Sequence, residues 1–313
     1  MIIEKNKPLS EFTTWKVGGP ADFFVRAKTE QDFLEAIRYA KEHGINFTVI
    51  GGGSNILVSD KGYRGLVIKN EIESYEFKEG SVTAGSGLSM SRLAVLALHN
   101  NFLGLQWAIG LPGTVGGAVF GNSNCFGGST GEDLIEATLC DREGKIRVEQ
   151  AEYFNFSYDF SKVQDTKEIV LSAVFRLKKE SEEEIAILRK KITEVAAERS
   201  MKQPIGARVA GSTFKALHQT EEVIKKIEVV CPDWKRGLRD GYISAGFIID
   251  SCLHLKGYRQ GQMEISPLHA NFFVNLGGAT ATEVKNLIDF VKKKCQYILK
   301  IELEEEIKYL GEF

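Results

Sequence analysis

Hydrophobic positions in the first hundred residues switch between helical and strand-like spacing. Thr29, followed by Asp32 three residues later, is typical of a helix N-cap, and Gly44 is typical of a helix end. A β-branched run at 46–50 predicts a strand that leads directly into a glycine-rich turn. The pattern therefore predicts a helix, a strand and a glycine turn in that order. The apolar residues on the inner face of this helix are Phe33, Leu34, Ile37 and Ala40.

Three further stretches carry helical periodicity. A helix is predicted over 88–100, a long amphipathic helix over 181–200, and a third helix from Thr282 onward. Gln203-Pro204 closes the long helix and indicates a domain junction, after which a second α/β region runs over about 206–300. The inward residues predicted for these helices are Leu93, Leu96 and Ala97, then Ile185, Leu188, Ile192 and Val195, and finally Val284, Leu287, Ile288, Val291 and Cys295.

Residues 93–131 contain no Asp, Glu, Lys or Arg, whereas 26% of the whole chain is charged. A membrane span is excluded, because Pro112, several glycines and several asparagines interrupt any continuous apolar helix. Two interpretations of this charge-free segment remain open. It is either a glycine-packed turn in the protein core, or backbone pressed against a bound cofactor, and the other glycine loops of the chain favour the cofactor.

Glycine-rich loops occur three times in the first half of the chain, at 51–55, 83–87 and 110–128. Consecutive glycines direct their N–H groups into one concavity that binds anions, and Ser54 and Asn55 add side-chain donors. No Gly-Lys-Ser/Thr completes a P-loop, and no Gly-x-Gly-x-x-Gly follows a strand, so neither nucleotide motif is indicated. A long ligand such as FAD fits, because its pyrophosphate needs backbone donors and its flavin needs an apolar slot.

Composition excludes several classes of function. A chain of 313 residues predicts two or three domains, and a net charge of −2 offers no basic surface for nucleic acid. The lysines at 292–294 are interpreted as a solvated helical turn rather than a binding patch. Five scattered cysteines without a Cys-x-x-Cys pair argue against a disulfide framework and against a metal site. With no signal-peptide segment at the start, they favour a cytoplasmic protein without membrane insertion.

Six motifs follow one another between residues 12 and 307. Together they resemble the ordered motifs of the MurB family of UDP-N-acetylenolpyruvoylglucosamine reductases. Any one of them would be weak, but the order and the span are shared with the family. The motifs are Phe12-Thr-Thr-Trp-Lys-Val-Gly-Gly-Pro-Ala21, Val49-Ile-Gly-Gly-Gly-Ser-Asn-Ile-Leu-Val58, Gly110-Leu-Pro-Gly-Thr-Val-Gly-Gly-Ala-Val119, Ala210-Gly-Ser-Thr-Phe-Lys215, Ser266-Pro-Leu-His-Ala-Asn-Phe272 and Leu303-Glu-Glu-Glu-Ile307.

The resemblance implies an α+β fold with two parts. An FAD-binding domain of the vanillyl-alcohol-oxidase (PCMH) type would consist of two subdomains, over 1–70 and 71–204. A separate α/β substrate-binding domain would cover 205–300, and a C-terminal strand at 301–313 would return to the FAD domain. Little room follows Tyr258 for an extra loop, so the chain is similar to the shorter, type II members of the family.

The resemblance also implies the reaction. NADPH would reduce FAD, and the flavin would then reduce the enolpyruvyl group of UDP-N-acetylenolpyruvoylglucosamine to give UDP-N-acetylmuramate, a step of peptidoglycan precursor synthesis. The catalytic residues carried over are Ser212, the proton-donating acid, and Glu306, which strand alternation places on the same side as Glu304. The residues expected to bind FAD are Gly51, Gly52, Gly53, Ser54, Asn55, Gly85, Gly110, Pro112, Gly113, Thr114, Gly116, Gly117 and Ala118.

Two positions depart from the family's pattern. Asp159 stands where the family has an arginine that stabilises the enolate-like charge, and Ala216 stands where it has an asparagine. Because a carboxylate beside a developing negative charge is costly in a dry site, either Asp159 turns away and another cation such as Arg208 substitutes, or the chemistry differs. The alternative hypothesis is therefore a divergent FAD-binding relative with a changed substrate or a lost reductase activity.

Substrate contacts are carried over from the same motifs. The lysine of the Lys-Gly-Tyr segment would hold the diphosphate as a point charge. A satisfied core histidine remains an open alternative for His269. The residues expected to bind the substrate are Tyr158, Arg208, Lys215, Lys256 and His269.

Overall fold

The computed structural model describes residues 1–125 and 127–313, with the side chains of residues 191, 193 and 195–200 left outside the description. The described chain divides into two compact units, and each unit draws on separate segments of the sequence. Unit 1 consists of Met1–Lys7, Ala21–Gly53 and Arg64–Ala197, and unit 2 of Pro8–Pro20, Ser54–Tyr63 and Glu198–Phe313.

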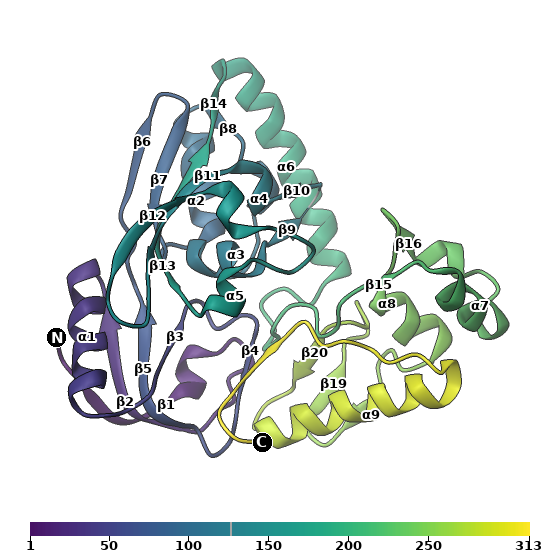
Figure 1. Ribbon diagram of the computed structural model, residues 1–313. Coiled ribbons are helices and arrows are strands. Elements are labelled where there is room, and N and C mark those ends of the chain that lie inside the picture. Colours follow the sequence, from purple (N-terminus) through teal and green to yellow (C-terminus); the bar gives the residue numbers. More distant parts are fainter. Residues whose placement is uncertain (126) are drawn as a thin grey trace. The chain divides into compact units, whose positions relative to one another are not determined.

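The first sheet of unit 1 contains the predicted strand, and the predicted helix precedes that strand in the chain (Figure 1). Thr29 caps helix α1 (Glu30–Glu42) in a capping box with Asp32, and Gly44 follows the helix with φ 63°, which confirms the predicted start and end. Phe33, Ile37 and Ala40 are buried and Leu34 is half-buried. The sheet has the order β1 (Glu4–Pro8), β2 (Pro20–Ala27), β5 (Tyr63–Asn70) and β3 (Phe47–Ile50), with β3 and β5 parallel.

The second sheet of unit 1 has five strands in the order β12-β11-β13-β7-β6, and all its pairs are antiparallel. Its inner strands β11 and β13 share a core with the first sheet, because Cys140 and Leu171 pack in one cluster with Phe33 and Ile37 of α1. The strands are β6 (Tyr75–Lys78), β7 (Ser81–Gly85), β11 (Leu134–Cys140), β12 (Ile146–Gln150) and β13 (Ile169–Arg176).

Helix α2 (Met90–His99) confirms the helix predicted over 88–100. Leu93 and Ala97 are buried as predicted, and Leu96 is half-buried. The charge-free segment continues from this helix through short elements of unit 1. These and the other short elements of the unit are β8 (Phe102–Leu103), η2 (Gln106–Ala108), α3 (Val115–Gly121), β9 (Asn124–Cys125), β10 (Gly128–Ser129), α4 (Thr130–Asp133), η3 (Ala151–Phe154), α5 (Val163–Thr166) and β14 (Lys178–Lys179).

Helix α6 (Glu182–Lys202) confirms the long helix predicted over 181–200. Ile185 is 1% exposed, whereas Leu188 and Ile192 are half-buried, and the predicted inward Val195 lies outside the described side chains. The chain passes from unit 1 to unit 2 within this helix, between residues 197 and 198. The segments 8–20 and 54–63, expected in the first subdomain, belong to unit 2. The finer domain boundaries remain predictions.

Unit 2 is organised around helix α9 (Ala281–Leu299), whose N-cap Thr280 forms a capping box with Glu283. All five residues predicted to face inward from this helix are 0% exposed, and they share one core with Trp15 and Phe273. The other elements are η1 (Leu9–Phe12), β4 (Ile56–Val58), β15 (Leu217–His218), α7 (Glu221–Val230), η4 (Trp234–Gly237), β16 (Leu238–Arg239), β17 (Tyr242–Ile243), α8 (Ala245–Phe247), η5 (Ile248–Cys252), β18 (Arg259–Gln260), β19 (Met263–Ile265), β20 (Phe273–Asn275) and β21 (Lys308–Leu310).

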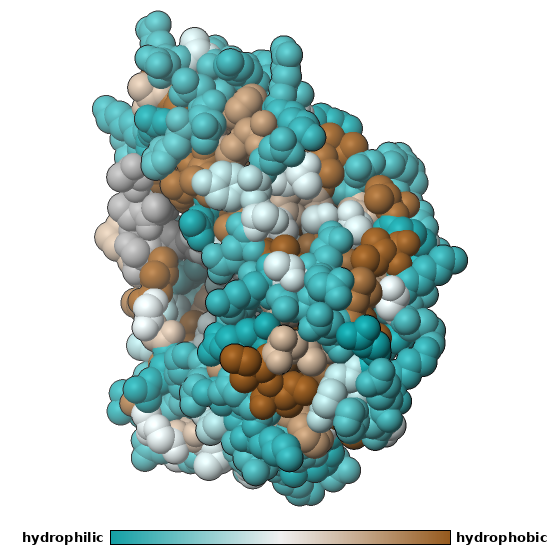
Figure 2. Space-filling model, turned by 90° about the vertical axis from the view of Figure 1, so that its left-hand side faces the viewer, coloured by the Kyte–Doolittle hydropathy of each residue, from teal (hydrophilic) through white to brown (hydrophobic). Residues whose placement is uncertain are grey.

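One face of the molecule carries several separate apolar groups. On the face shown in Figure 2, hydrophobic side chains form small groups separated by hydrophilic ones. Exposed apolar residues of the second sheet, such as Ile146 and Val148, are of the kind that folded proteins commonly leave at their surface. Within the described part of the chain, no helix has the length and apolar character needed to cross a membrane.

Candidate functional site

Two glycine loops of unit 1 lie against each other. Gly51 and Gly52 directly follow β3, and a Cβ atom on Gly52 would lie 3.0 Å from the Cα atom of Gly113. A Cβ atom on Gly51 would lie 2.6 Å from Oγ1 of Thr114. Larger residues would push the two loops apart, so glycine is required by the close approach. The fold therefore joins the first glycine loop to the charge-free segment.

The segment 83–87, predicted as a glycine loop, is instead the end of strand β7 followed by a turn, and it packs against the charge-free segment as well. The backbone N–H of Gly116 donates to the carbonyl oxygen of Ser86 at 2.8 Å, and a Cβ atom on Gly116 would lie 2.9 Å from Cβ of Ser86. A Cβ atom on Gly85 would lie 2.4 Å from the carbonyl oxygen of Ile72. Packing within the protein thus already requires glycine at position 85, and its role in cofactor binding remains a prediction.

The joined loops fit the phosphate-binding backbone expected for FAD. Gly52 is exposed, and among the described residues none accepts a hydrogen bond from its backbone N–H. Gly53 has φ 68°, a left-handed conformation that helps successive N–H groups to point into one concavity. The other residues expected at the cofactor in this unit are Gly110, Pro112 and Gly117, which are exposed, Gly113 and Gly116, which are half-buried, and Thr114 and Ala118, which are buried.

Lys69 adds a positive charge beside the first glycine loop, and sequence reasoning missed it. Lys69 lies on β5 opposite Ile50, and its ammonium group donates a hydrogen bond to the carbonyl oxygen of Gly51. Burial lowers the pKa of Lys69, while the Glu71 carboxylate acts in the opposite direction. The available signal was a lysine that directly follows the apolar run at 66–68.

The predicted catalytic residues come together in unit 2. The segment after Ser212 pairs with the C-terminal segment through an antiparallel bridge between Phe214 and Glu305. The backbone N–H of Glu306 donates to the carbonyl oxygen of Thr213 at 2.9 Å. On the other side of the bridge, the N–H of Lys215 donates to the carbonyl oxygen of Glu304 at 2.9 Å. Ser212 therefore directly precedes the residue that is paired with Glu306.

Asn55 holds the backbone of Glu306 in place. Its side-chain Nδ2 atom donates to the backbone carbonyl oxygen of Glu306 at 3.3 Å. Its backbone carbonyl oxygen accepts from the N–H of Lys308 at 2.9 Å. Immediately beyond these residues, β4 and β21 pair in parallel. Ser54 and Asn55 belong to unit 2, so their expected donation to the cofactor remains a prediction beside this structural role.

The residues expected to bind the substrate lie mostly in unit 2. Lys215 forms an ion pair with Glu304, which is exposed, so Lys215 is tied to the paired C-terminal segment. Lys256 forms an ion pair with Asp250 at 3.2 Å. Arg208 is exposed, and its Nη1 atom would lie 3.4 Å from a Cβ atom on Gly277. Their roles toward a substrate stay predictions.

The surroundings of His269 disfavour its protonated form. Its Nδ1 atom accepts a hydrogen bond from the backbone N–H of Asn271 at 3.3 Å, and its ring packs edge-on against Phe272. Burial lowers the pKa of His269, and the positive charge of Lys256 lowers it further. A Cβ atom on Gly246 would lie 2.9 Å from Cε1 of the ring, so a glycine makes room for it.

Acidification is expected to destabilise the protein through His269. The unfolded chain takes up a proton at the ordinary histidine pKa of 6.5, whereas the folded state resists it to lower pH. Stability is therefore complete above that value and decreases as the pH falls toward the folded-state pKa. The thermal midpoint should fall more steeply between about pH 7.5 and about pH 5.5 in the wild type than in His269→Asn. Equal falls would contradict this assignment.

Tyr158 and Asp159 form a tight turn in unit 1. Ser157 and Phe160 exchange backbone hydrogen bonds of 3.1 and 3.2 Å across the turn, and Asp159 adopts a left-handed conformation with φ 51°. Gln164 donates its side-chain amide to the carbonyl oxygen of Asp159 at 3.0 Å. Aspartate and asparagine tolerate this conformation better than most residues. The left-handed backbone of the turn therefore favours aspartate at position 159.

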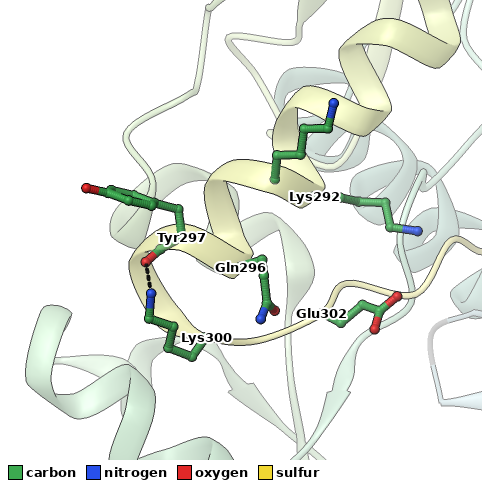
Figure 3. A pocket seen from close by; sticks show the side chains of 6 residues that line it. Lys292, Gln296, Tyr297, Lys300 and Glu302 are labelled. Atoms are coloured by element: carbon green, nitrogen blue, oxygen red, sulfur yellow. Dashed lines mark hydrogen bonds between the residues drawn. The ribbon is translucent and has the colours of Figure 1, made fainter.

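A cavity of about 520 Å³ lies at the end of α9 (Figure 3). The basic run at its rim was interpreted from sequence as a solvated turn, but Lys292 is specifically engaged. Its Nζ atom lies 2.8 Å from Oε1 of Glu305, the residue before Glu306. The Lys292–Glu305 ion pair therefore fixes the C-terminal segment from the helix side. The cavity is lined by Lys292, Lys293, Gln296, Tyr297, Lys300 and Glu302.

The described cysteines are free thiols, and four of the five are buried. Burial raises the pKa of Cys140 to about 11 and that of Cys295 to about 12, so both thiols stay protonated at neutral pH. Within the described residues, no group of three or more His, Cys, Asp or Glu side chains is arranged to hold a metal ion.

Comparison with known proteins covers both parts of the chain. Residues 21–149 match the model of an FAD binding domain, and residues 203–310 match the UDP-N-acetylenolpyruvoylglucosamine reductase C-terminal domain. The chain is 35% identical over 311 residues to the reductase of that name from Bacillus pumilus, covering 98% of this chain and 94% of the relative. It is 33% identical to the reductase from Listeria innocua, covering 100% of this chain and 96% of the relative.

A solved structure of a reductase of the same kind also matches this chain over nearly its whole length. The crystal structure of UDP-N-acetylenolpyruvylglucosamine reductase (MurB) from Thermus caldophilus superposes with a TM-score of 0.78 at 29% sequence identity. The match covers 99% of this chain and 100% of that chain. The α+β class and the FAD-binding domain expected from the sequence are therefore confirmed.

Proposed function

The chain belongs to the UDP-N-acetylenolpyruvoylglucosamine reductase (MurB) family, and on this premise we propose that Ser212 and Glu306 carry its reaction. The protein is an FAD-dependent oxidoreductase that uses NADPH to reduce the enolpyruvyl group of UDP-N-acetylenolpyruvoylglucosamine. The product is UDP-N-acetylmuramate, a precursor of peptidoglycan. Because NADPH and UDP-sugars are made in the cytoplasm, we propose that the protein acts there.

Reduction of the enolpyruvyl double bond adds one hydride and one proton. When bound, FAD would supply the hydride for the terminal vinyl carbon, after reduction by NADPH. The hydroxyl group of Ser212 donates the proton to the adjacent carbon, which carries the carboxylate. Glu306 is the second acidic group of the site. Lys256 and Lys215 offer ammonium groups to the anionic parts of the substrate.

One observation carries this assignment: the ladder of residues 213–215 with residues 304–306. It brings Ser212 and Glu306, which lie far apart in the sequence, to neighbouring positions of one paired segment. The ladder is itself held by Asn55 at Glu306 and by Lys292 at Glu305. Such fixation of catalytic groups on paired backbone keeps them in a productive geometry.

FAD fits the glycine loops of unit 1. A pyrophosphate needs backbone donors and close approach, and the exposed Gly52 N–H beside the glycines of the 110–118 segment offers both. Lys69 contributes a positive charge at the same loop. The residues that would hold the cofactor are those predicted from the sequence, with Lys69 as an addition.

The decisive experiment follows the flavin of the purified protein. Visible absorbance should show flavin bands, and NADPH should bleach them in the absence of oxygen. Anaerobic addition of UDP-N-acetylenolpyruvoylglucosamine should then restore the oxidised spectrum. Failure of the substrate to reoxidise the flavin would sink the reductase assignment for this chain.

Asp159→Asn is expected to leave turnover within about threefold of the wild type. Asparagine is close to aspartate in shape and tolerates the same left-handed backbone, so the turn of residues 157–160 should persist. Steady-state rates with NADPH and the enolpyruvyl substrate measure the effect. A loss of orders of magnitude would show that the Asp159 carboxylate takes part in the chemistry and would favour the divergent relative with a changed substrate.

A further inference from the structure

Asn271 binds the segment that follows Ser212 on the edge opposite to Glu306. Its Oδ1 atom accepts a hydrogen bond from the backbone N–H of Phe214 at 3.0 Å, and its Nδ2 atom donates to the carbonyl oxygen of Phe214 at 2.8 Å. The backbone carbonyl of Asn271 accepts from the N–H of Thr213 at 2.8 Å. One residue thus makes three hydrogen bonds to the two residues that follow Ser212.

Because of these bonds, residues 213–214 form the central segment of three that are hydrogen-bonded side by side. On one edge they bind Asn271, and on the other edge they pair with Glu305 and Glu306. Asn271 is 6% exposed and Phe214 is 1% exposed, so water cannot replace the bonds without opening the core. The Asn271 backbone is itself anchored, because its N–H donates to Nδ1 of His269.

We propose that Asn271 is a positioning residue for proton delivery by Ser212. It holds Phe214 and Thr213 in register with Glu305 and Glu306, and thereby fixes the relative placement of Ser212 and Glu306. This inference rests on the proposed catalytic role of Ser212. A primary amide is the required group, because it must accept one hydrogen bond and donate another to the same residue.

Loss of this clamp should affect only the half of the catalytic cycle that uses Ser212. Reduction of the flavin by NADPH needs no proton from Ser212, whereas reduction of the enolpyruvyl group does. Asn271→Ala is therefore expected to slow anaerobic flavin reoxidation by the substrate on the order of 100-fold at saturation. Its flavin reduction by NADPH should stay within about twofold of the wild type.

Asn275 offers a matched control. It lies on β20 in the same segment, is 4% exposed, and uses its amide to bond to the carbonyl of Trp15 and to the N–H groups of Gly277 and Ala279. Asn275→Ala removes a buried amide with three bonds to backbone groups, one more than the two made by the Asn271 amide, but it leaves the Ser212 segment untouched. Both half-reactions of Asn275→Ala should remain within about twofold of the wild type, although its thermal midpoint falls.

Asn271→Asp tests the hydrogen-bond pattern without changing side-chain size. The ionised carboxylate accepts from the N–H of Phe214 but repels its carbonyl oxygen, whereas the protonated carboxyl group donates to that oxygen and restores both bonds. Burial raises the pKa of the introduced carboxyl group. Relative to the wild type, the reoxidation rate of the variant should therefore recover as the pH falls from about 8 to about 6.

Amide hydrogen exchange supplies a readout that is independent of turnover. Peptides covering 210–217 and 303–308 should exchange faster in Asn271→Ala than in the wild type, and they should be unchanged in Asn275→Ala. If Asn271→Ala does not fold, the exchange of the same peptides is compared between Asn271→Asp and the wild type.

Equal slowing of both half-reactions in Asn271→Ala, or kinetics like those of Asn275→Ala, would overturn the positioning role. A wild-type flavin that the substrate cannot reoxidise would instead refute the proposed function, and the positioning role would fall with it. A wild type that turns over while Asn271→Asp shows no recovery at low pH would refute the clamp alone.

Discussion

Ser212→Ala is expected to lower the rate of flavin reoxidation by the enolpyruvyl substrate by at least about 100-fold. The change removes the hydroxyl group that we propose as the proton donor, but it leaves the paired backbone of residues 213–215 and 304–306 intact. Substrate affinity should change little, because the proposed contacts to the anionic parts of the substrate come from other residues. Stopped-flow absorbance of the flavin at several substrate concentrations separates the rate from the affinity.

Thr213→Val is the matched control for this substitution. The Thr213 side chain is fully buried, and among the described residues its hydroxyl group has no hydrogen-bond partner. Valine keeps the branched shape and removes only the neighbouring hydroxyl, so reoxidation should stay within about threefold of the wild type. Similar rates for Ser212→Ala and Thr213→Val would show that the proton comes from elsewhere.

Gly52→Val is expected to abolish flavin binding in the purified protein. A Cβ atom at this position would already lie 3.0 Å from the Cα atom of Gly113, and the two branches of valine would extend into the contact or over the exposed loop. The loops must then separate, and the donors for the pyrophosphate lose their common geometry. The ratio of flavin absorbance to protein absorbance measures the bound cofactor.

Gly121→Ala serves as the control for the glycine substitution. Gly121 lies in α3, in the same charge-free segment as Gly113. A Cβ atom on Gly121 would meet only Oγ of Ser123, at an ordinary contact distance of 3.9 Å. Its flavin content should equal that of the wild type. Full flavin content in Gly52→Val would contradict a cofactor cradle at this loop, whereas loss of flavin in both variants would indicate general damage to unit 1.

The local elements of this protein could be predicted from sequence because their signals are local. Thr29 with Asp32 caps α1 as expected, and the apolar stripe of α9 is fully buried as expected. Helical periodicity and N-caps depend on residues three or four positions apart, so one segment contains its own evidence. The glycine-rich segments were likewise recognised from composition, but Ser81–Gly85 is strand β7 and Val115–Gly121 is helix α3, so the predicted loops at 83–87 and 110–128 are loops only in part.

Within the candidate site, residues were predictable where a motif named them. Ser212 and Glu306 were predicted in this way, and their catalytic roles stay predictions; the structure shows that Thr213, the residue after Ser212, is paired with Glu306. Lys69 and Asn271 were not identified as parts of the site, because a lysine after an apolar run and an asparagine in a short motif have many ordinary roles. Only the bonds to Gly51 and to Phe214 distinguish them.

The sequence by itself therefore determined the main helices, the positions of the glycine-rich segments and, through ordered motifs, the family and its reaction. The tertiary structure alone decided which distant segments meet: Gly52 with Gly113, and Thr213 with Glu306 on one edge and Asn271 on the other. It also showed that Asp159 occupies a left-handed turn. The reason is that periodicity fixes the conformation of a segment, whereas strand partners and close backbone approaches depend on the packing of the whole chain.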